Sequence, residues 1–563
     1  MNRHRTLRST AAAGLAVAAV LLCSCSPTPR ASVADATTAH QYSSAARVRG
    51  AATTGAAAVR GTLRAAGGPY LTDSSGRVVL LHGVDAVYKH PPYVLYADPG
   101  KPWNFDAADA RRIAGLGFDV VRLGILWAGL EPGHGGPNDP AVCTPGRPGD
   151  PHMFVAAVAD AYLAKVARTV DLLGRYHVYT LLDMHQDVYN TAFRGEGAPT
   201  WAVCTDGQPV VPVGGRWSRN YADPTLAVAL DHFWRNDVAG DLQGQFDLVW
   251  ATVARYFAHN PWVVGYDPYN EPFSVEHTES DRQAFATALE CFYTGRRHPG
   301  SLAGGRRVHC PADDPAVGVV PAIERADPRH LVFVEPDIYA HRHGAPDLLG
   351  PMDLPRLVFN FHVYCPDRNP VTGEPTDVTA CESDELAALA RHEEQRAALS
   401  SPRQPGGPAV FMSEFGASHD ATLLEHTVAD ANLFEVGWAY WSWKYYDDPT
   451  GSADEALVSP SGALEPSASA LSVTYAQAVA GSPVTTTLTP ATGRFELLYT
   501  PSARSSAPTV VFVPGTARYP NGYCTTVSGG TVASAPGARR LLVRADPGAD
   551  RVDVVVAAGR CAP

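Results

Sequence analysis

The chain has 563 residues, of which 45% are hydrophobic and 18% charged, and its formal net charge is -12. This composition is typical of a globular protein and excludes a largely disordered one, and the length indicates two domains. The negative charge argues against a nucleic-acid partner, because binding to phosphates requires a basic surface.

The first 25 residues have the pattern of a bacterial export signal. Arg3, Arg5 and Arg8 precede an apolar run over 10–22 that is too short to span a membrane but suits the core of a signal peptide. The run ends in Leu-Cys-Ser-Cys, which is similar to a lipobox with Cys25 as the lipidated residue. An ordinary secretory signal cut nearby is the alternative. We therefore expect an exported protein, either secreted or anchored to the outer face of the bacterial cell membrane.

Residues 26–68 are rich in Ala, Ser, Thr and Arg and lack apolar periodicity, which predicts a flexible tether. The folded part is expected to begin at Pro69. A turn at 73–76 lies between two short apolar runs. We expect a hairpin over 70–81 that closes the floor of the next domain and leads into its first strand.

Short apolar runs then alternate with helical stretches, such as 154–176 and 384–399, as far as residue 478. This alternation is typical of βα units around a parallel sheet. Eight such repeats over roughly 400 residues predict an α/β fold, a (β/α)8 TIM barrel over 69–478 whose longest insertion lies at about 187–242. The predicted strands are 79–84, 120–123, 179–183, 264–269, 331–334, 357–361, 409–413 and 438–441.

Helical periodicity is lost over 479–563. The runs there alternate or are β-branched, and Pro and Gly separate them. This pattern predicts a small C-terminal β-sandwich. Its predicted strands are 485–488, 494–499, 509–513, 522–528 and 552–556.

Cysteine usage agrees with export. Without Cys23 and Cys25, the ten cysteines leave eight, and an even number in an exported chain indicates disulfides. The sequence shows no C-x-x-C or H-x-x-x-H cluster beside them, so we expect neither a metal site nor a cofactor. Cys291–Cys310 and Cys365–Cys381 are expected pairs because their members lie close together along the chain. Cys524 and Cys561 stand alone in the C-terminal region and are expected to pair with each other. Cys143–Cys204 then follows by elimination.

Two of the apolar runs end in a glutamate: Glu271, within Asn-Glu-Pro, and Glu414, within Ser-Glu-Phe-Gly. Reactive groups of a parallel barrel lie at the C-terminal ends of its strands, and hydrolysis of a glycosidic bond takes two carboxylates that face each other across it. The pair therefore predicts a glycosidase, although a single glutamate after a strand is more often a solvated loop residue or a salt-bridge partner. In a retaining enzyme their carboxyl groups should lie about 5–5.5 Å apart.

Together with other motifs in the same order, these two strand ends resemble glycoside hydrolase family 5, a family of retaining (β/α)8 enzymes. The resemblance extends over about 69–446. A narrower resemblance is to endoglycoceramidases, whose C-terminal sandwich is also similar. One departure is Asp85, which ends the first strand where the family commonly has Asn and would change a hydrogen bond near the sugar site. The additional motifs are Gly-Phe-Asp-Val-Val-Arg-Leu at 117–123, Asp-Met-His at 183–185, His-Val-Tyr at 362–364, Trp441, and, for the narrower resemblance, 87–93, 183–189, 195–201 and 437–444.

The chemistry and the resemblance together imply roles for these residues. Glu414 is the expected nucleophile and Glu271 the expected acid/base, with a raised pKa. Tyr364 is expected to orient Glu414 and Arg122 to hold it in place, with His362 on the same rim. For each neighbour of the pair the alternative is a structural role, namely a packed aromatic, a structural ion pair or a surface charge. The implied sugar contacts are Lys89, His185, Asp187, Asn270 (at the 2-hydroxyl), Tyr364, Trp441 and Lys444.

The narrower resemblance implies a monomeric endo-glycosidase that cuts between the oligosaccharide and the ceramide of a glycosphingolipid. Its partners would be the glycolipid and, through Cys25, a membrane surface. Two alternatives remain: a related β-glycosidase acting on simple glucosyl or galactosyl lipids or soluble β-glucans, and a glycan-binding lipoprotein without activity. Candidates for the apolar groove that receives the lipid are Phe273, Trp201, Trp217 and Tyr446.

Overall fold

The computed structural model describes most of the chain from residue 61 onward. The predicted signal peptide, Cys25 and Cys310 lie outside the described residues. Within the described part, no helix combines the length and the apolar character needed to cross a membrane. The described residues are 40–43, 61–65, 67–133, 135–145, 156–211, 213, 217–274, 279–295, 318–342, 348–365, 368–369, 374–505, 507–559 and 561.

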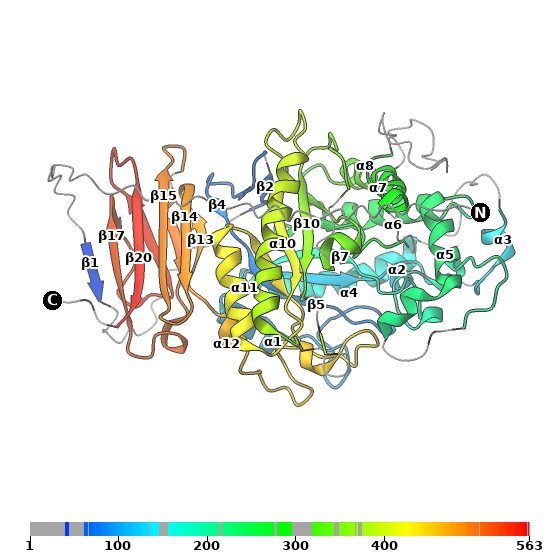
Figure 1. Ribbon diagram of the computed structural model, residues 1–563, viewed down its shortest axis with the longest axis horizontal. Helices are drawn as coiled ribbons and strands as arrows, with labels where there is room; N and C mark the ends of the chain where they lie inside the picture. The colour runs from blue at the N-terminus through cyan, green and yellow to red at the C-terminus, as the bar shows by residue number, and fades with distance from the viewer. Residues whose placement is uncertain are drawn as a thin grey trace, which may run out of the picture. The chain divides into compact units, whose positions relative to one another are not determined.

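Eight parallel strands form a closed barrel, as predicted, and they follow one another around it in chain order. Their residues are buried throughout, which is usual for parallel strands covered by helices (Figure 1). All eight predicted strands are present, with ends shifted by a few residues. The barrel strands are β5 (His82–Ala86), β6 (Val120–Ile125), β7 (Tyr179–Met184), β8 (Val263–Asp267), β9 (Leu331–Val334), β10 (Leu357–Val363), β11 (Ala409–Phe415) and β12 (Gly437–Tyr440).

The helices begin and end where capping residues stand in the sequence. In the first one, Asp106 accepts a hydrogen bond from the Ala108 amide, and the helix ends at Gly117, whose φ of 95° suits glycine. The helix predicted at 384–399 begins earlier, at Val378, because Asp377 caps it. The helices are α1 (Ala107–Leu116), α2 (Trp127–Leu130), α3 (Pro140–Cys143), α4 (Ala156–Arg175), α5 (Pro224–Arg235), α6 (Leu242–Phe257), α7 (Glu279–Thr294), α8 (Val319–Ala326), α9 (Ile338–Arg342), α10 (Val378–Ala398), α11 (Ala421–Leu433) and α12 (Ala468–Leu471).

The C-terminal part is built from two antiparallel sheets, as predicted. One has the order β1-β17-β20-β15-β14 and the other β18-β19-β16-β13-β4-β3-β2. The sequence analysis missed three short strands, β13, β18 and β19, and began the sandwich at 479, whereas β13 already starts at Tyr475. The C-terminal strands are β13 (Tyr475–Val479), β14 (Gly481–Thr489), β15 (Arg494–Pro501), β16 (Thr509–Phe512), β17 (Tyr523–Ser528), β18 (Gly530–Val532), β19 (Arg540–Ala545) and β20 (Val552–Ala558).

The N-terminal hairpin corrects the predicted boundary. Strands β2 (Arg64–Ala65), β3 (Leu71–Thr72) and β4 (Val78–Val79) extend the sandwich sheet, because β4 pairs with β13. The hairpin is therefore part of a sandwich sheet, and the ordered structure begins before Pro69. Its Leu71 and Val79 also pack against barrel residues such as Val120 and Tyr179, so the hairpin covers the barrel floor as predicted. Within the expected tether, β1 (His40–Ser43) also pairs, with β17. Backbone groups at a sheet edge accept a strand with little demand on its side-chain pattern, so periodicity did not reveal β1 and β2.

The barrel floor and the sandwich share a buried polar contact. The ring of His82, at the start of β5, lies between the rings of Trp438 and Tyr475, at 4.3 and 3.7 Å. Asp119 accepts hydrogen bonds from the His82 backbone N–H at 2.9 Å and from the Gln477 amide at 3.1 Å. Burial raises the pKa of Asp119 to about 7. The two domains therefore share one core at this point.

Three of the four predicted disulfides are present. They are Cys143–Cys204, Cys365–Cys381 and Cys524–Cys561. Cys291 is disulfide-bonded as well, but its predicted partner, Cys310, lies outside the described residues. Cys365 directly follows Tyr364, so one disulfide ties the end of a barrel strand to α10.

The close approach of barrel and sandwich can be tested at Gly117. A Cβ there would lie 2.2 Å from the Phe512 ring of β16, and φ is +95°. Gly76 is a matched control, because its φ is +73° and nothing lies within 4 Å of a Cβ added to it. We expect Gly76→Ala to lower the free energy of unfolding by about 1 kcal/mol through backbone strain. Gly117→Ala should cost about 1–3 kcal/mol more through the clash.

Denaturant unfolding of both variants at one pH measures the difference. Equal losses would mean that the sandwich can move away from the barrel floor at no cost.

Candidate active site

Glu271 and Glu414 face each other at the C-terminal end of the barrel. Glu414 lies within β11 and Glu271 follows β8, and both side chains are buried. One carboxylate oxygen of each lies within 4.8 Å of the other and of a ring nitrogen of His362. This upper limit on one oxygen–oxygen distance is compatible with carboxyl groups about 5–5.5 Å apart, as in retaining glycosidases. Two facing carboxyl groups at this end of the barrel are the arrangement that double displacement requires.

The backbone of Glu271 is held in an unusual conformation. Its φ is 43°, in the left-handed region that disfavours residues other than glycine. Its N–H donates to Oε2 of Glu335 at 2.9 Å, and the Gln186 amide donates to the carbonyls of Asn270 and Glu271 at 2.9 and 3.1 Å. These contacts keep the carboxyl group directed at its partner.

Two donors hold the carboxylate of Glu414. The Arg122 guanidinium lies 2.6 Å from Oε1, and the Tyr364 hydroxyl donates to Oε2 at 2.7 Å. Both contacts are the ones expected from the sequence. Because each oxygen has its own donor, the carboxylate is held in one orientation.

Arg122 is also the centre of a larger buried cluster. Burial raises the pKa values of Asp85 and Asp267 well above the ordinary range, since one guanidinium cannot neutralise all of its neighbours. Burial therefore favours the protonated form of these two carboxyl groups. The carboxyl oxygens around Arg122 belong to Asp85 (3.3 Å), Asp183 (3.0 Å), Asp267 (2.9 Å), Glu335 (3.1 Å) and Glu414 (2.6 Å).

His362 bridges the two glutamates. Its Nδ1 lies 3.0 Å from Oε1 of Glu271 and 3.4 Å from Oε2 of Glu414, and its Nε2 lies 3.3 Å from Glu335. Burial alone would lower the pKa of this histidine, but the carboxylates of Glu335 and Glu414 outweigh burial and raise the pKa well above its ordinary value. The ring is therefore a cation that keeps two acidic groups close together.

Asn270 belongs to the same cluster. Its Oδ1 accepts a hydrogen bond from Arg122 at 2.7 Å, and its amide donates to the carbonyl of Gln186 at 3.0 Å. The side chain is buried. Its orientation is thus fixed by the protein before any sugar binds.

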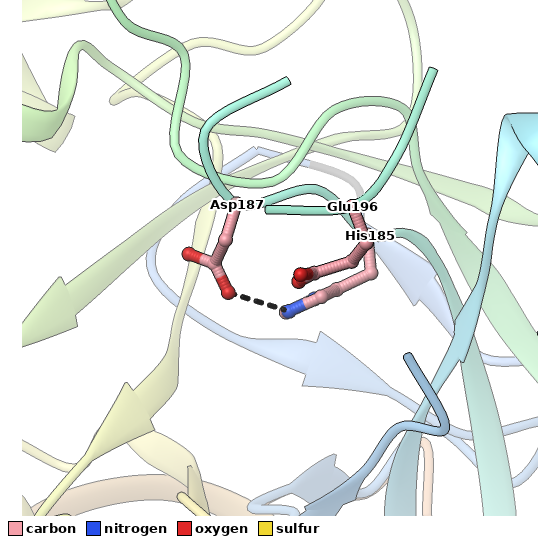
Figure 2. A group of neighbouring side chains, drawn as sticks. All are labelled: His185, Asp187 and Glu196. Atoms are coloured by element: carbon pink, nitrogen blue, oxygen red, sulfur yellow. Dashed lines mark ion pairs between the residues drawn. The ribbon is translucent and has the colours of Figure 1, made fainter. Parts of the chain in front are cut away.

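A second cluster lies beside the first and contains His185, Asp187 and Glu196 (Figure 2). Figure 2 shows the three side chains converging, with an ion pair between His185 and Asp187. The Lys89 ammonium binds the same carboxylates, at 2.7 Å from Asp187 and 3.4 Å from Glu196. Burial opposes the charge of His185, but Asp183 outweighs it and raises the pKa to about 10. The spacing suits a metal, yet a protonated histidine is no ligand and the lysine already supplies the charge.

Lys89 is buried and joins three loops. Besides Asp187 and Glu196, it lies 3.2 Å from Asp448 and donates to the Thr450 hydroxyl at 2.7 Å. The sequence offered two roles for Lys89, a sugar contact or a surface charge, and neither accounts for all of these contacts. Its buried ammonium holds the loops at the rim of the site together.

Trp441 follows β12 and lies against this second cluster. Its ring stacks on His185 with centroids 5.3 Å apart and planes 12° apart, and the Lys89 ammonium is 4.6 Å from its centroid. Its indole N–H donates to Glu455 at 3.2 Å. Lys444 points elsewhere, since its ammonium lies 3.8 Å from Asp109 of α1. The structure thus brings Trp441 to the site and does not join Lys444 to either cluster.

Several members of the clusters were missed as site residues in the sequence. Glu335 directly follows β9, and the strand-end rule that identified Glu271 and Glu414 would have found it. Asp183 and Asp267 end long apolar runs and carry the same signal. Asp448 and Thr450 lie in a loop without periodicity, so no pattern in the sequence marked them.

Comparison with known proteins agrees with this geometry. The family model for cellulase (glycosyl hydrolase family 5) matches residues 96–447, and that for the glycoside hydrolase family 5 C-terminal domain matches 474–556. Endoglycoceramidase I of Rhodococcus hoagii (strain 103S) is 27% identical over 496 residues, which is 85% of each protein. Endoglycoceramidase of Cyanea nozakii is 30% identical over 225 residues, 36% of this chain and 40% of that one.

The fold has also been seen in solved structures. The structure of endo-glycoceramidase II from Rhodococcus sp. covers 87% of this chain and 100% of its own, with a TM-score of 0.65 and 25% identity. The crystal structure of an endogalactoceramidase shares the fold, with a TM-score of 0.58 and 24% identity over 88% of this chain and 100% of its own. Since the first family model spans more than half of the sequence and the second spans the sandwich, the chain belongs to glycoside hydrolase family 5.

Proposed function

We propose that this protein is a retaining, endo-acting glycosidase that cleaves the β-glycosidic bond between the oligosaccharide and the ceramide of glycosphingolipids. The observation that carries the proposal is the short separation of the two buried glutamates, within 4.8 Å, at the mouth of a family 5 barrel. The substrate class is supported by the endoglycoceramidase of R. hoagii, which aligns over 85% of both proteins.

The geometry supports a different role for each glutamate. Glu414 attacks the anomeric carbon and forms a covalent glycosyl-enzyme, because Arg122 and Tyr364 hold it as an oriented carboxylate. Glu271 protonates the departing ceramide oxygen and then takes a proton from the water that hydrolyses the intermediate. His362, within reach of both, limits the repulsion between them as charge moves from one to the other.

The sugar is proposed to lie between the two clusters. Asn270, oriented by Arg122, would bind the 2-hydroxyl, and Trp441 would offer its ring face to a pyranose. His185 and Asp187 would supply polar contacts at the rim. Lys89 would act through Asp187 as well as on the sugar, since its ammonium is 2.7 Å from that carboxylate.

A group of aromatic side chains next to Glu271 suits the lipid. Phe273 packs against Tyr221 at 4.5 Å and Tyr339 at 5.9 Å, and Trp217 lies 6.1 Å from Tyr221. Three of these side chains are only half-buried, as a groove wall should be. Of the four predicted candidates, Trp217 alone is half-buried, since Phe273 and Tyr446 are each 5% exposed and Trp201 is fully buried against Trp127. Phe273 therefore lies behind the wall that Trp217, Tyr221 and Tyr339 expose.

Product analysis tests the reaction and the substrate class. Purified protein is incubated with a ganglioside, lactosylceramide, galactosylceramide and a cello-oligosaccharide, each lipid in two chain lengths. We expect intact oligosaccharide and ceramide from the glycolipids. Release of terminal sugars alone would exclude the endo mode, and preferred cleavage of the cello-oligosaccharide would favour a β-glucanase, the reaction that the cellulase family model suggests.

Variants of the two glutamates separate their roles. Glu271→Gln should lower kcat on the glycolipid by about 10²–10⁴-fold, the usual contribution of a general acid, but should still cleave an aryl glycoside whose leaving group needs no proton. Glu414→Gln should lose activity on both substrates because no covalent intermediate forms. Hydrolysis by both variants as fast as by the parent would show that these glutamates are not the catalytic pair and would favour the glycan-binding lipoprotein without activity.

Asp85 gives a pH test of the buried charge cluster. Burial raises its pKa well above the ordinary value, so the folded protein keeps a proton that the unfolded chain releases above about pH 4. Stability contributed by this group is therefore lost as pH rises toward the folded pKa. Asp85→Asn removes that loss, so its gain in the free energy of unfolding should be larger at pH 8 than at pH 5. Denaturant unfolding at both pH values measures it, and an equal difference at both would show that Asp85 is ionised in the native state.

We also propose that the protein is exported and held as a monomer at the outer face of the cell membrane through a lipid on Cys25. Support comes from the basic residues, the apolar run and the Leu-Cys-Ser-Cys sequence, and from a site to which one chain supplies both glutamates. Metabolic labelling with a fatty-acid analogue should tag the protein, and Cys25→Ala should abolish the tag. An untagged protein found in the medium would indicate an ordinary secretory signal.

A further inference from the structure

The segment that follows β10 contacts the proposed nucleophile, Glu414. Tyr364 donates to Glu414, and the next residue, Cys365, is joined by a disulfide to Cys381 of α10. Three residues later, Arg368 reaches across to the end of β11. The end of β10 is therefore fixed on two sides.

Arg368 donates hydrogen bonds to the backbone at the end of β10 and at the end of β11. Its Nη1 donates to the carbonyl of Ala417 at 2.8 Å and its Nη2 to that of Gly416 at 2.5 Å. Its Nε donates to the Cys365 carbonyl at 3.3 Å, and its guanidinium carbon lies 5.4 Å from the centroid of the Tyr364 ring. The planar guanidinium of arginine has several N–H donors, so it can bind carbonyls of both segments and stack on an aromatic ring as well.

The backbone that Arg368 holds is strained. Gly416 and Ala417 have φ values of 87° and 47°, and only the first is a glycine. A left-handed alanine costs of order 1 kcal/mol or more and persists only where its surroundings hold it. The N–H of Ala417 donates to the carbonyl of Trp441, whose own N–H donates to the carbonyl of Phe415. The turn after Glu414 therefore also sets the position of Trp441.

The same loop braces the next two residues. Oε1 of Glu374 accepts from the backbone N–H of His419 at 2.9 Å, and Oε2 accepts from the Ser418 hydroxyl. The Asn369 N–H donates to the Glu374 carbonyl at 2.8 Å. Four successive residues after β11, from 416 to 419, are thus held by one loop.

We propose that Arg368 is a positioning residue for the nucleophile, because it sets the distance between the Tyr364 ring and the turn that carries Glu414. The inference rests on the proposed function, in which Glu414 attacks the sugar. Glu414 and Tyr364 lie on neighbouring strands, and their 2.7 Å hydrogen bond exists only while the ends of those strands keep their spacing. A displacement of about 1 Å in such a contact can cost about 100-fold in rate.

Arg396 offers a matched control at the opposite end of β11. Its Nη1 donates to the carbonyls of Gly406 and Pro408, at 2.6 and 3.4 Å, just before the strand begins. Arg396→Ala therefore removes a similar grip on the same strand, far from the carboxylates. The activity of Arg396→Ala therefore shows how much a loss of stability alone lowers the rate.

The test compares Arg368→Ala, Arg368→Lys and Arg396→Ala in the full-length protein, well below their melting temperatures. We expect Arg368→Ala to lower kcat by about 10–100-fold while KM changes little. Its profile of kcat/KM against pH should differ from the parent's, because Tyr364 no longer donates to Glu414 as it does in the parent. Lysine lacks the fork and should not restore activity, whereas guanidinium ion added to Arg368→Ala should restore part of it.

Arg396→Ala should lose thermal stability and keep the parent's kcat and pH profile. An Arg368→Ala protein whose kcat and profile match those of Arg396→Ala would overturn the inference.

A fluorinated glycoside inactivator separates this outcome from failure of the proposed function. If the parent is not labelled on Glu414, the proposed nucleophile is wrong. If the parent is labelled there and Arg368→Ala is labelled at the parent's rate, only the positioning role is wrong. We expect labelling of Glu414 in both, at least about 10-fold slower in the variant.

Discussion

One buried guanidinium holds the catalytic end of the barrel together. Arg122 lies on β6 and is fully buried, yet carboxyl oxygens from five residues lie within 3.3 Å of it. Gathering so many acids in a dry site is costly, and the gain from one ion pair does not repay the desolvation of all of them. The barrel tolerates the cluster because strand geometry fixes it and because burial favours the protonated forms of Asp85 and Asp267. Of the five carboxyl groups, that of Glu414 lies nearest to the guanidinium of Arg122, at 2.6 Å.

This arrangement explains how two glutamates can be close and still differ in role. Glu414 has two donors, Arg122 and Tyr364, whereas Glu271 lies next to His362 and donates its backbone N–H to the side chain of Glu335. The two carboxyl groups are thus held by different partners, one by a guanidinium and a phenol and the other beside an imidazole. Donors fixed before the substrate arrives need no reorganisation during the reaction, which is the main source of electrostatic catalysis.

The sequence was sufficient for the barrel and for the catalytic pair. Buried parallel strands are continuous apolar runs, so all eight were visible, and chemistry then singled out the glutamates at two of their ends. The sandwich was less visible, because short strands such as β18 (Gly530–Val532) gain their pairing from neighbours distant in sequence. The hairpin over the barrel floor was predicted, but its membership of a sandwich sheet was not, since periodicity says which residues form strands and not which sheet β4 joins. The contact of Lys444 with Asp109 was not predicted for a similar reason, because the two residues are more than three hundred positions apart in the chain.

Residue type alone also could not distinguish a side chain that contacts the sugar from one that holds the loops of the site in place. Lys89 has the position of a sugar-binding residue, yet Asp187, Glu196 and Asp448 surround its ammonium. Such a cation joins the loops after β5, β7 and β12, and it can meet a hydroxyl group only while it keeps these partners. A sugar hydroxyl therefore meets charged groups that are already paired with one another, so it is selected by shape and hydrogen bonds. Recognition of the rest of the molecule is left to the aromatic wall beside Glu271, where Trp217, Tyr221 and Tyr339 are half-buried.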